Sequence, residues 1–104
     1  MADFHTTLYF EESAATITMA GSLDASTAPQ LQQLLIKAAK RHPSRLVLDA
    51  TELTFMASAG LRCLVFARQK MGSEVSLAIA GASDGVLATI RMAGFHRSVE
   101  LVER

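Results

Sequence analysis

The chain has 104 residues, half of them hydrophobic, and ten basic side chains balance ten acidic ones. This length suits a single domain over residues 1–104, and the absence of net charge argues against a nucleic-acid partner. One cysteine, no basic apolar leader and no apolar run of about 20 residues predict a cytoplasmic protein without a disulfide, a signal peptide or a membrane span.

Two strands joined by a turn are predicted at the start of the chain. Leu8 and Phe10 alternate with polar residues, and Ile17 and Met19 do the same in the next segment. The polar residues 11–13 between the two segments predict the turn.

A helix is predicted over residues 26–43. Thr27 with Gln30 fits a capping box at its start. Pro29 is tolerated in a first turn, and Pro43 ends the helix. The apolar residues recur at the spacing of one helical face, at Leu31, Leu34, Leu35, Ala38 and Ala39.

The rest of the sequence predicts two strand–helix pairs and a last strand. These are a strand at 45–50 that we expect to be buried on both faces, a helix at 59–72, a strand at 74–81, a short helix at 83–94 and a strand at 98–104. Strands separated by helices need parallel crossovers, whereas the first two strands can pair as a hairpin. We therefore predict an α/β fold, with a mixed sheet of four to five strands and helices packed against it.

Ser58 lies between two alanines, where the third predicted strand and a loop give way to a helix. Its simplest role is an N-cap, which accepts a hydrogen bond from a free helix N–H. A nucleophile elbow, G-x-S-x-G, is a second possibility: Gly60 fits the second glycine, but Met56 replaces the first. Asp84 and His96 follow Ser58 in hydrolase order, yet the chain is short for that fold. Phosphorylation is a third possibility, because a phosphate of about −1.5 to −2 charge would meet free N–H groups and disrupt an apolar contact.

The second predicted helix has an apolar side and a polar side. Cys63, Leu64, Ala67 and Met71 share the apolar side, and we interpret Cys63 as a small core residue. Phe66 falls within the polar arc. It is either an anchor for a partner or a ring tucked under a neighbouring loop, and the sequence favours neither.

Asp24, in GSLDAST, precedes the first helix. It is either a turn or capping residue, or an acidic group near Ser58 if the fold brings the two loops together. The three histidines are widely scattered, no spacing of His, Cys, Asp or Glu predicts a metal site, and the glycines form no phosphate loop. We expect no metal and no cofactor.

Three segments together resemble one known family. RLVLDATELTFMASAGLRCLV, residues 45–65, strongly resembles the signature of STAS domains, the bacterial anti-sigma factor antagonist family. That signature is an apolar strand ending in Asp, a short loop, and a Ser-containing motif followed by Gly-Leu that opens a helix. GSLDASTAPQL resembles the second motif of the family, and VLATIRMAGF resembles its third helix. The resemblance extends from about Leu8 to Val102.

The resemblance implies a STAS fold and a switch rather than an enzyme. In this family the unphosphorylated protein binds a GHKL-type serine kinase that is also an anti-sigma factor, and so frees the sigma factor. The kinase phosphorylates the motif serine, which aligns with Ser58, and the complex dissociates; a PPM-type serine phosphatase resets the cycle. Asp24 aligns with an aspartate that lies close to that serine. The kinase-binding surface would be formed or bordered by Met56, Ala57, Ala59, Gly60, Arg62 and Phe66.

Two positions depart from the usual motif. Ala57 stands where many members carry Asp and others Ser, so it supplies neither charge nor a hydrogen bond. Ala59 removes a frequent second serine, which leaves Ser58 as the only hydroxyl in the motif. The resemblance also allows a non-switching STAS scaffold or a ligand-binding module in a signalling or lipid-transport complex. We expect a monomer, the default for a small neutral domain.

Overall fold

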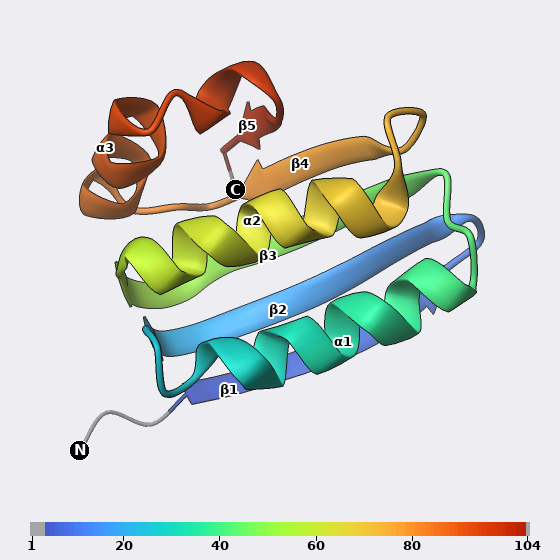
Figure 1. Cartoon of the computed structure of the whole chain (residues 1–104), viewed down its shortest axis with the longest axis horizontal. Coiled ribbons are helices and arrows are strands. Elements are labelled where there is room, and N and C mark those ends of the chain that lie inside the picture. The colour runs from blue at the N-terminus through green and yellow to red at the C-terminus, as the bar shows by residue number, and fades with distance from the viewer. Residues whose placement is uncertain (1–3, 104) are drawn as a thin grey trace.

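The computed structural model describes residues 4–103, which form a five-stranded sheet, three α-helices and one short 3₁₀ helix (Figure 1). The elements in chain order are β1 (Phe4–Glu11), β2 (Ala14–Leu23), α1 (Ala28–Lys40), β3 (Arg45–Met56), α2 (Ser58–Met71), β4 (Ser76–Ala80), α3 (Asp84–Met92), η1 (Phe95–Arg97) and β5 (Glu100–Val102). This order of strands and helices confirms the predicted one. None of these helices is long and apolar enough to cross a membrane.

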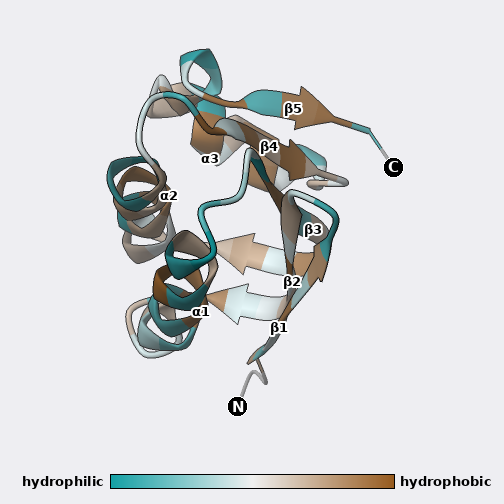
Figure 2. Ribbon diagram, turned by 90° about the vertical axis from the view of Figure 1, so that its right-hand side faces the viewer, coloured by the Kyte–Doolittle hydropathy of each residue, from teal (hydrophilic) through white to brown (hydrophobic). Residues whose placement is uncertain are grey.

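The sheet follows the order of the chain, β1-β2-β3-β4-β5. β1 and β2 pair antiparallel as a hairpin, and each later strand pairs parallel with the strand before it. The helices between the parallel strands supply the crossovers that such pairs need. α1 and α2 lie side by side across one face of the sheet (Figure 1, Figure 2). The predicted mixed α/β sheet with helices against it is therefore confirmed.

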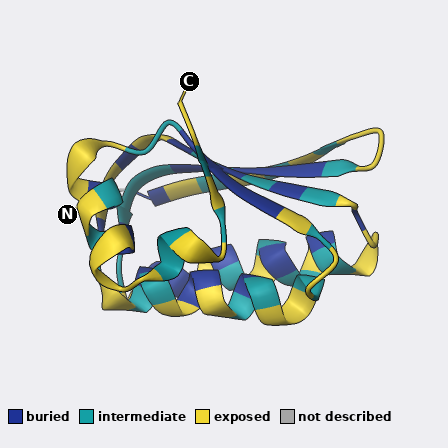
Figure 3. Cartoon of the chain, turned by 90° about the horizontal axis from the view of Figure 1, so that it is seen from above, coloured by how far each residue is buried: buried dark blue, intermediate teal, exposed yellow. Residues whose placement is uncertain are grey.

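One hydrophobic core lies between the sheet and its helices (Figure 3). Ile17 of β2, Leu35 of α1 and Leu64 of α2 are all fully buried within it. Removing such side chains from water supplies most of the stabilisation of a small domain, about 1.5–3 kcal/mol for each large one. Cys63 is also buried here, as expected of a small core residue.

β3 is buried on one face only, so the prediction of burial on both faces is wrong. Leu46, Leu48 and Ala50 are buried, whereas Val47 and Asp49, which alternate with them, are half-buried. The reason is that α1 and α2 both cover the same face. The residues that point the other way belong to the uncovered face, on which Tyr9 of β1 is 44% exposed.

β3 is also longer than predicted, because it continues through the segment expected to be a loop and ends only at Met56. This extension stays paired with β2 through two shifts of register, one between Thr18 and Ala20 and one between Gly21 and Ser22. Such irregularities bend a strand and change where it leads. The Ser58 motif therefore lies at the end of β3 and is not preceded by a loop.

The start of α1 differs from the predicted capping box. Thr27 occupies the N-cap position but makes no side-chain capping bond. Its hydroxyl donates to the carbonyl oxygen of Ser22 (2.8 Å) and accepts from the amide of Asp24 (2.9 Å). Thr27 is therefore used to close the turn that leaves β2, so it cannot cap the helix.

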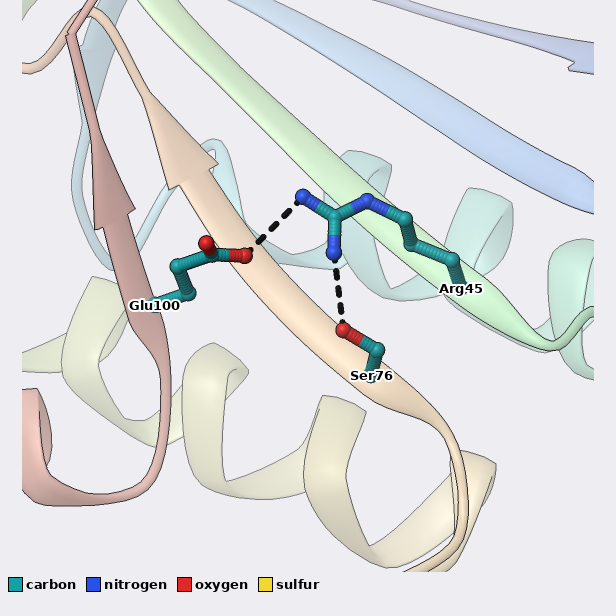
Figure 4. A network of polar contacts seen from close by, with 3 residues as sticks. All are labelled: Arg45, Ser76 and Glu100. Atoms are coloured by element: carbon teal, nitrogen blue, oxygen red, sulfur yellow. Dashed lines mark hydrogen bonds and ion pairs between the residues drawn. The ribbon is translucent and has the colours of Figure 1, made fainter.

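A surface network ties the last three strands together (Figure 4). The guanidinium of Arg45 in β3 donates to the Ser76 hydroxyl in β4 (2.8 Å) and to a carboxylate oxygen of Glu100 in β5 (3.0 Å). Both charged side chains are substantially exposed, so the ion pair contributes no more than about 1 kcal/mol. The network helps to hold the short β5 in place at the edge of the sheet.

Candidate functional site

The ends of β2 and β3 bring two of the predicted site segments together. The two strands are parallel neighbours, and Leu23 at the end of β2 is paired with Met56 at the end of β3. Asp24 follows the first strand, and Ser58 follows the second after one residue. The amide of that residue, Ala57, donates to the carbonyl oxygen of Leu23 (2.9 Å). The fold therefore joins the Asp24 turn to the Ser58 motif, the condition on which the functional interpretation of Asp24 depended.

Gly60 lets α2 begin close to the ends of both strands. A Cβ atom at this position would lie 2.6 Å from Cγ of Met56 and 2.9 Å from Cδ2 of Leu23, shorter than real Cβ contacts. Both neighbours are buried, so neither can move freely away. Gly60 is thus required by close approach, one of the usual reasons for glycine at a fixed position.

Ser58 is the first residue of α2, so the prediction that it caps the helix is wrong by one position. The N-cap is Ala57, whose backbone is extended (φ −87°, ψ 177°) and whose side chain has no acceptor. The Ser58 side chain is exposed, and within residues 4–103 its hydroxyl makes no hydrogen bond. An unbonded hydroxyl on the surface is accessible to a modifying enzyme.

The geometry gives the nucleophile elbow no support. An activated serine needs a base within hydrogen-bond reach. The Ser58 hydroxyl has no imidazole partner in the described chain, and Nδ1 of His96 is buried without a hydrogen bond.

Asp24 organises the turn that leads into α1. Its Oδ1 accepts from the Ser26 hydroxyl (2.7 Å), the Ser26 amide (2.9 Å) and the Thr27 amide (3.2 Å). These bonds, the one from the Ser26 hydroxyl most of all, hold the pKa of Asp24 below its ordinary value, although loss of hydration opposes them. Of the two local roles considered for Asp24, these bonds support the turn residue, whereas the N-cap position of α1 belongs to Thr27. The charge of Asp24 also stands in the loop that the Ala57–Leu23 bond ties to Ser58.

The residues predicted for the partner-binding surface differ in exposure. Arg62 is exposed, and Ala57 and Ala59 are half-buried. Met56 is only 3% exposed, and Gly60 is buried. Met56 and Gly60 therefore lie beneath the surface and shape it, Ala57 and Ala59 are partly accessible, and Arg62 faces the solvent.

Phe66 is half-buried and packs against the core rather than standing free in the polar arc. The ammonium of Lys70 lies over its ring, 5.6 Å from the centroid. Of the two roles left open by the sequence, the structure favours the tucked ring.

A family model described as "Mlab, STAS domain" matches residues 6–103 of the chain. The chain belongs to the STAS domain family.

Named relatives of this STAS domain are anti-sigma factor antagonists. The anti-sigma-F factor antagonist RsfB of Mycobacterium tuberculosis is 24% identical over 87 residues, which are 84% of this chain and 71% of RsfB. The crystal structure of an anti-sigma factor antagonist from Mycobacterium paratuberculosis has a TM-score of 0.88 at 23% identity, over 96% of this chain and 86% of that one.

The Bacillus cell fate determinant SpoIIAA has the same fold in two states. Its unphosphorylated form has a TM-score of 0.83 at 14% identity, over 96% of this chain and 88% of that one. Its phosphorylated form has a TM-score of 0.76 at 14% identity, over 96% of this chain and 91% of that one. At such identities these likenesses establish the fold.

Two exposed apolar residues of the STAS domain border the motif and escaped the sequence interpretation. Phe55, near the end of β3, is 55% exposed, and Val65 of α2 is 46% exposed. Val65 lies two helical turns after Ser58, with Arg62 between them on the same side of the helix. The helical spacing could have revealed Val65. Phe55 could not be found in this way, because the segment that holds it was taken for a loop.

Proposed function

We propose that this STAS domain is a cytoplasmic anti-sigma factor antagonist controlled by phosphorylation of Ser58. The unphosphorylated form binds a GHKL-type serine kinase that is also an anti-sigma factor, and phosphorylation of Ser58 releases it. A PPM-type serine phosphatase restores the binding form. The observation that carries this proposal is the exposed, unbonded hydroxyl of Ser58 at the start of α2.

The surface around Ser58 suits a contact that a phosphate would break. We define the motif face by the exposed residues on one side of α2, which are Ser58, Arg62 and Val65. Val65 gives this face an exposed apolar side chain, and Phe55 is a second exposed apolar residue near the end of β3, three positions before Ser58 in the chain. Exposed apolar side chains next to polar ones are typical of interaction sites. A phosphate placed among them in an interface has to lose its water, which is costly unless cations pair with it.

The way the Ser58 motif is held against β2 and β3 supports the same proposal. The Ala57–Leu23 bond and the close packing at Gly60 fix the start of α2 against two strands. A partner therefore meets a preorganised surface and loses little entropy in ordering it.

The first test is phosphosite mapping by mass spectrometry on the protein isolated from its own host with serine phosphatases inhibited. Ser58→Ala is the matched control. We expect a phosphate on Ser58 that is absent from the variant. A bare Ser58 under these conditions would overturn the proposed switch.

The second test measures binding by titration calorimetry to each GHKL-type serine kinase of the host. We expect Ser58→Ala to bind its kinase as the unmodified protein does, and Ser58→Asp to bind at least about tenfold more weakly, which is about 1.4 kcal/mol. Equal binding by both variants would contradict release by charge.

A non-switching STAS scaffold in a signalling or transport complex is the second candidate. The observation that favours it is Ala57, whose side chain offers neither charge nor a hydrogen bond beside Ser58. A stable native complex that contains only unphosphorylated protein would support this function in place of the switch.

A further inference from the structure

Arg62 is placed to reach Ser58 along α2. The two residues are four positions apart, so their Cβ atoms lie about 5–6 Å apart on one side of the helix. Long helical side chains lean toward the N-terminus, which directs the Arg62 side chain over the turn that holds Ser58. Both side chains are exposed, so neither needs to leave a packed position for the two to meet.

Arg62 is also the uncommitted cation of this helix. Arg68 donates to the carbonyl oxygens of Gly72, Val75 and Ser98, and Lys70 lies over a ring. The guanidinium of Arg62, by contrast, has neither a hydrogen bond nor an ion pair within the described part of the chain. α2 itself contains no acidic residue that could engage it.

We propose that Arg62 pairs in cis with the phosphate on Ser58 and thereby stabilises the phosphorylated form of this domain. The inference rests on the proposed function, since it needs Ser58 to be the modified residue. A guanidinium matches two phosphate oxygens at once, which makes such pairs stronger than those of a lysine. The order is the favourable one, with the anion four residues before the cation.

The pairing would compensate for two features of the motif. Ala57 provides no hydrogen bond to a phosphate through its side chain, and the ionised carboxylate of Asp24 lies in the adjoining loop. Repulsion from Asp24 would make phosphorylation of Ser58 less favourable, and Arg62 supplies the opposing attraction.

The same pairing changes what the motif face offers a partner. Before phosphorylation the face carries one free cation, Arg62. Afterwards the guanidinium is occupied by the phosphate, and the charge of the pair falls from about +1 to about −1. A partner carboxylate that had paired with Arg62 would lose this pair on phosphorylation, and the phosphate would also repel it.

The test uses protein in which phosphoserine is inserted at position 58 during translation, so no kinase is needed. Phosphorus NMR at increasing pH gives the second pKa of the phosphate, which is ordinarily about 6. Pairing favours the dianion, so we expect this pKa to be lower with Arg62 present than in Arg62→Gln, by about 0.2–0.4 unit. Lys70→Gln removes a charge far from Ser58 on the same helix and is the matched control. Arg62→Lys should recover part of the difference.

An equal phosphate pKa in the parent and in Arg62→Gln would overturn the pairing. That result would leave the switch untouched, because the phosphate is installed without the kinase. Conversely, if Ser58 is not phosphorylated in the host, the proposed switch is wrong, but the pairing measured in the phosphoserine protein still holds.

Thermal unfolding provides a second measurement. Phosphorylation should raise Tm more in the parent than in the Arg62→Gln variant. An equal change in both proteins would also contradict the proposal.

Discussion

The amide of Ala57 donates to the carbonyl oxygen of Leu23 across 2.9 Å, and this one bond joins the two loops of the candidate site. It continues the pairing of β2 and β3 by one step beyond the strands themselves. The position of Ser58 relative to the Asp24 turn is therefore set by the pairing of these two strands.

Replacing Gly60 by alanine should destabilise the domain. The new Cβ atom would lie 2.6 Å from Cγ of Met56 and 2.9 Å from Cδ2 of Leu23, so two buried side chains must shift. We expect the free energy of unfolding in urea to fall by about 1–3 kcal/mol, partly offset by the better helix propensity of alanine. Gly85→Ala in α3 is the control, because a Cβ atom there meets nothing within 4 Å. An unchanged stability in Gly60→Ala would show that the site can relax.

A serine at position 57 should stabilise α2. Ala57 already has the extended backbone of an N-cap but lacks a side-chain acceptor, so Ala57→Ser should raise the free energy of unfolding by about 1 kcal/mol. Ser83→Ala should lower it, because Ser83 accepts from the Val86 amide (3.3 Å) at the start of α3. Ser58→Ala should change stability by less than about 0.5 kcal/mol. A large loss on Ser58→Ala would mean that Ser58, not Ala57, caps the helix in solution.

Asp24 should make the domain acid-sensitive. Because its pKa is lowered in the folded state, its stabilising effect is complete well above the ordinary value of about 3.9 and is lost as the pH falls through the folded-state pKa. As the pH falls below about 4, the urea midpoint of unfolding should therefore decrease less steeply in Asp24→Asn than in the parent. Ser26→Ala removes the main cause of the shift, so carboxyl NMR should show the pKa of Asp24 moving back up. A pKa unaffected by Ser26→Ala would contradict the assigned cause.

Phe55 and Val65 should contribute to partner binding without contributing to folding. Both side chains are about half exposed, so Phe55→Ser and Val65→Ser should leave the free energy of unfolding within about 0.5 kcal/mol. We expect each change to weaken binding of the cognate kinase at least about fivefold, measured by titration calorimetry. Met92→Ser on α3 is the control, since Met92 is 89% exposed and lies outside the motif face. Loss of binding in that control would place the interface elsewhere.

Much of the fold could be predicted because helical spacing reports burial directly. Cys63, Leu64 and Ala67 fall on one side of α2 in the sequence, and all three are buried in the structure. The extension of β3 could not be predicted in this way, since it depends on pairing with β2 rather than on alternation of its own residues. The missing cap at Thr27 could not be predicted either, because its hydroxyl donates to the carbonyl oxygen of Ser22 instead. The exposure of Phe55 follows from that extension, and so remained hidden as well.

The steric constraint at Gly60 has a consequence for anyone who wishes to redirect this domain to a new client. The motif divides into positions that fold the protein, 56 and 60, and positions that face outward, 55, 62 and 65. A library restricted to the outward positions can explore new specificities on an unchanged scaffold. One that includes position 60 would mostly sample destabilised chains, and their loss of stability could be mistaken for lost recognition.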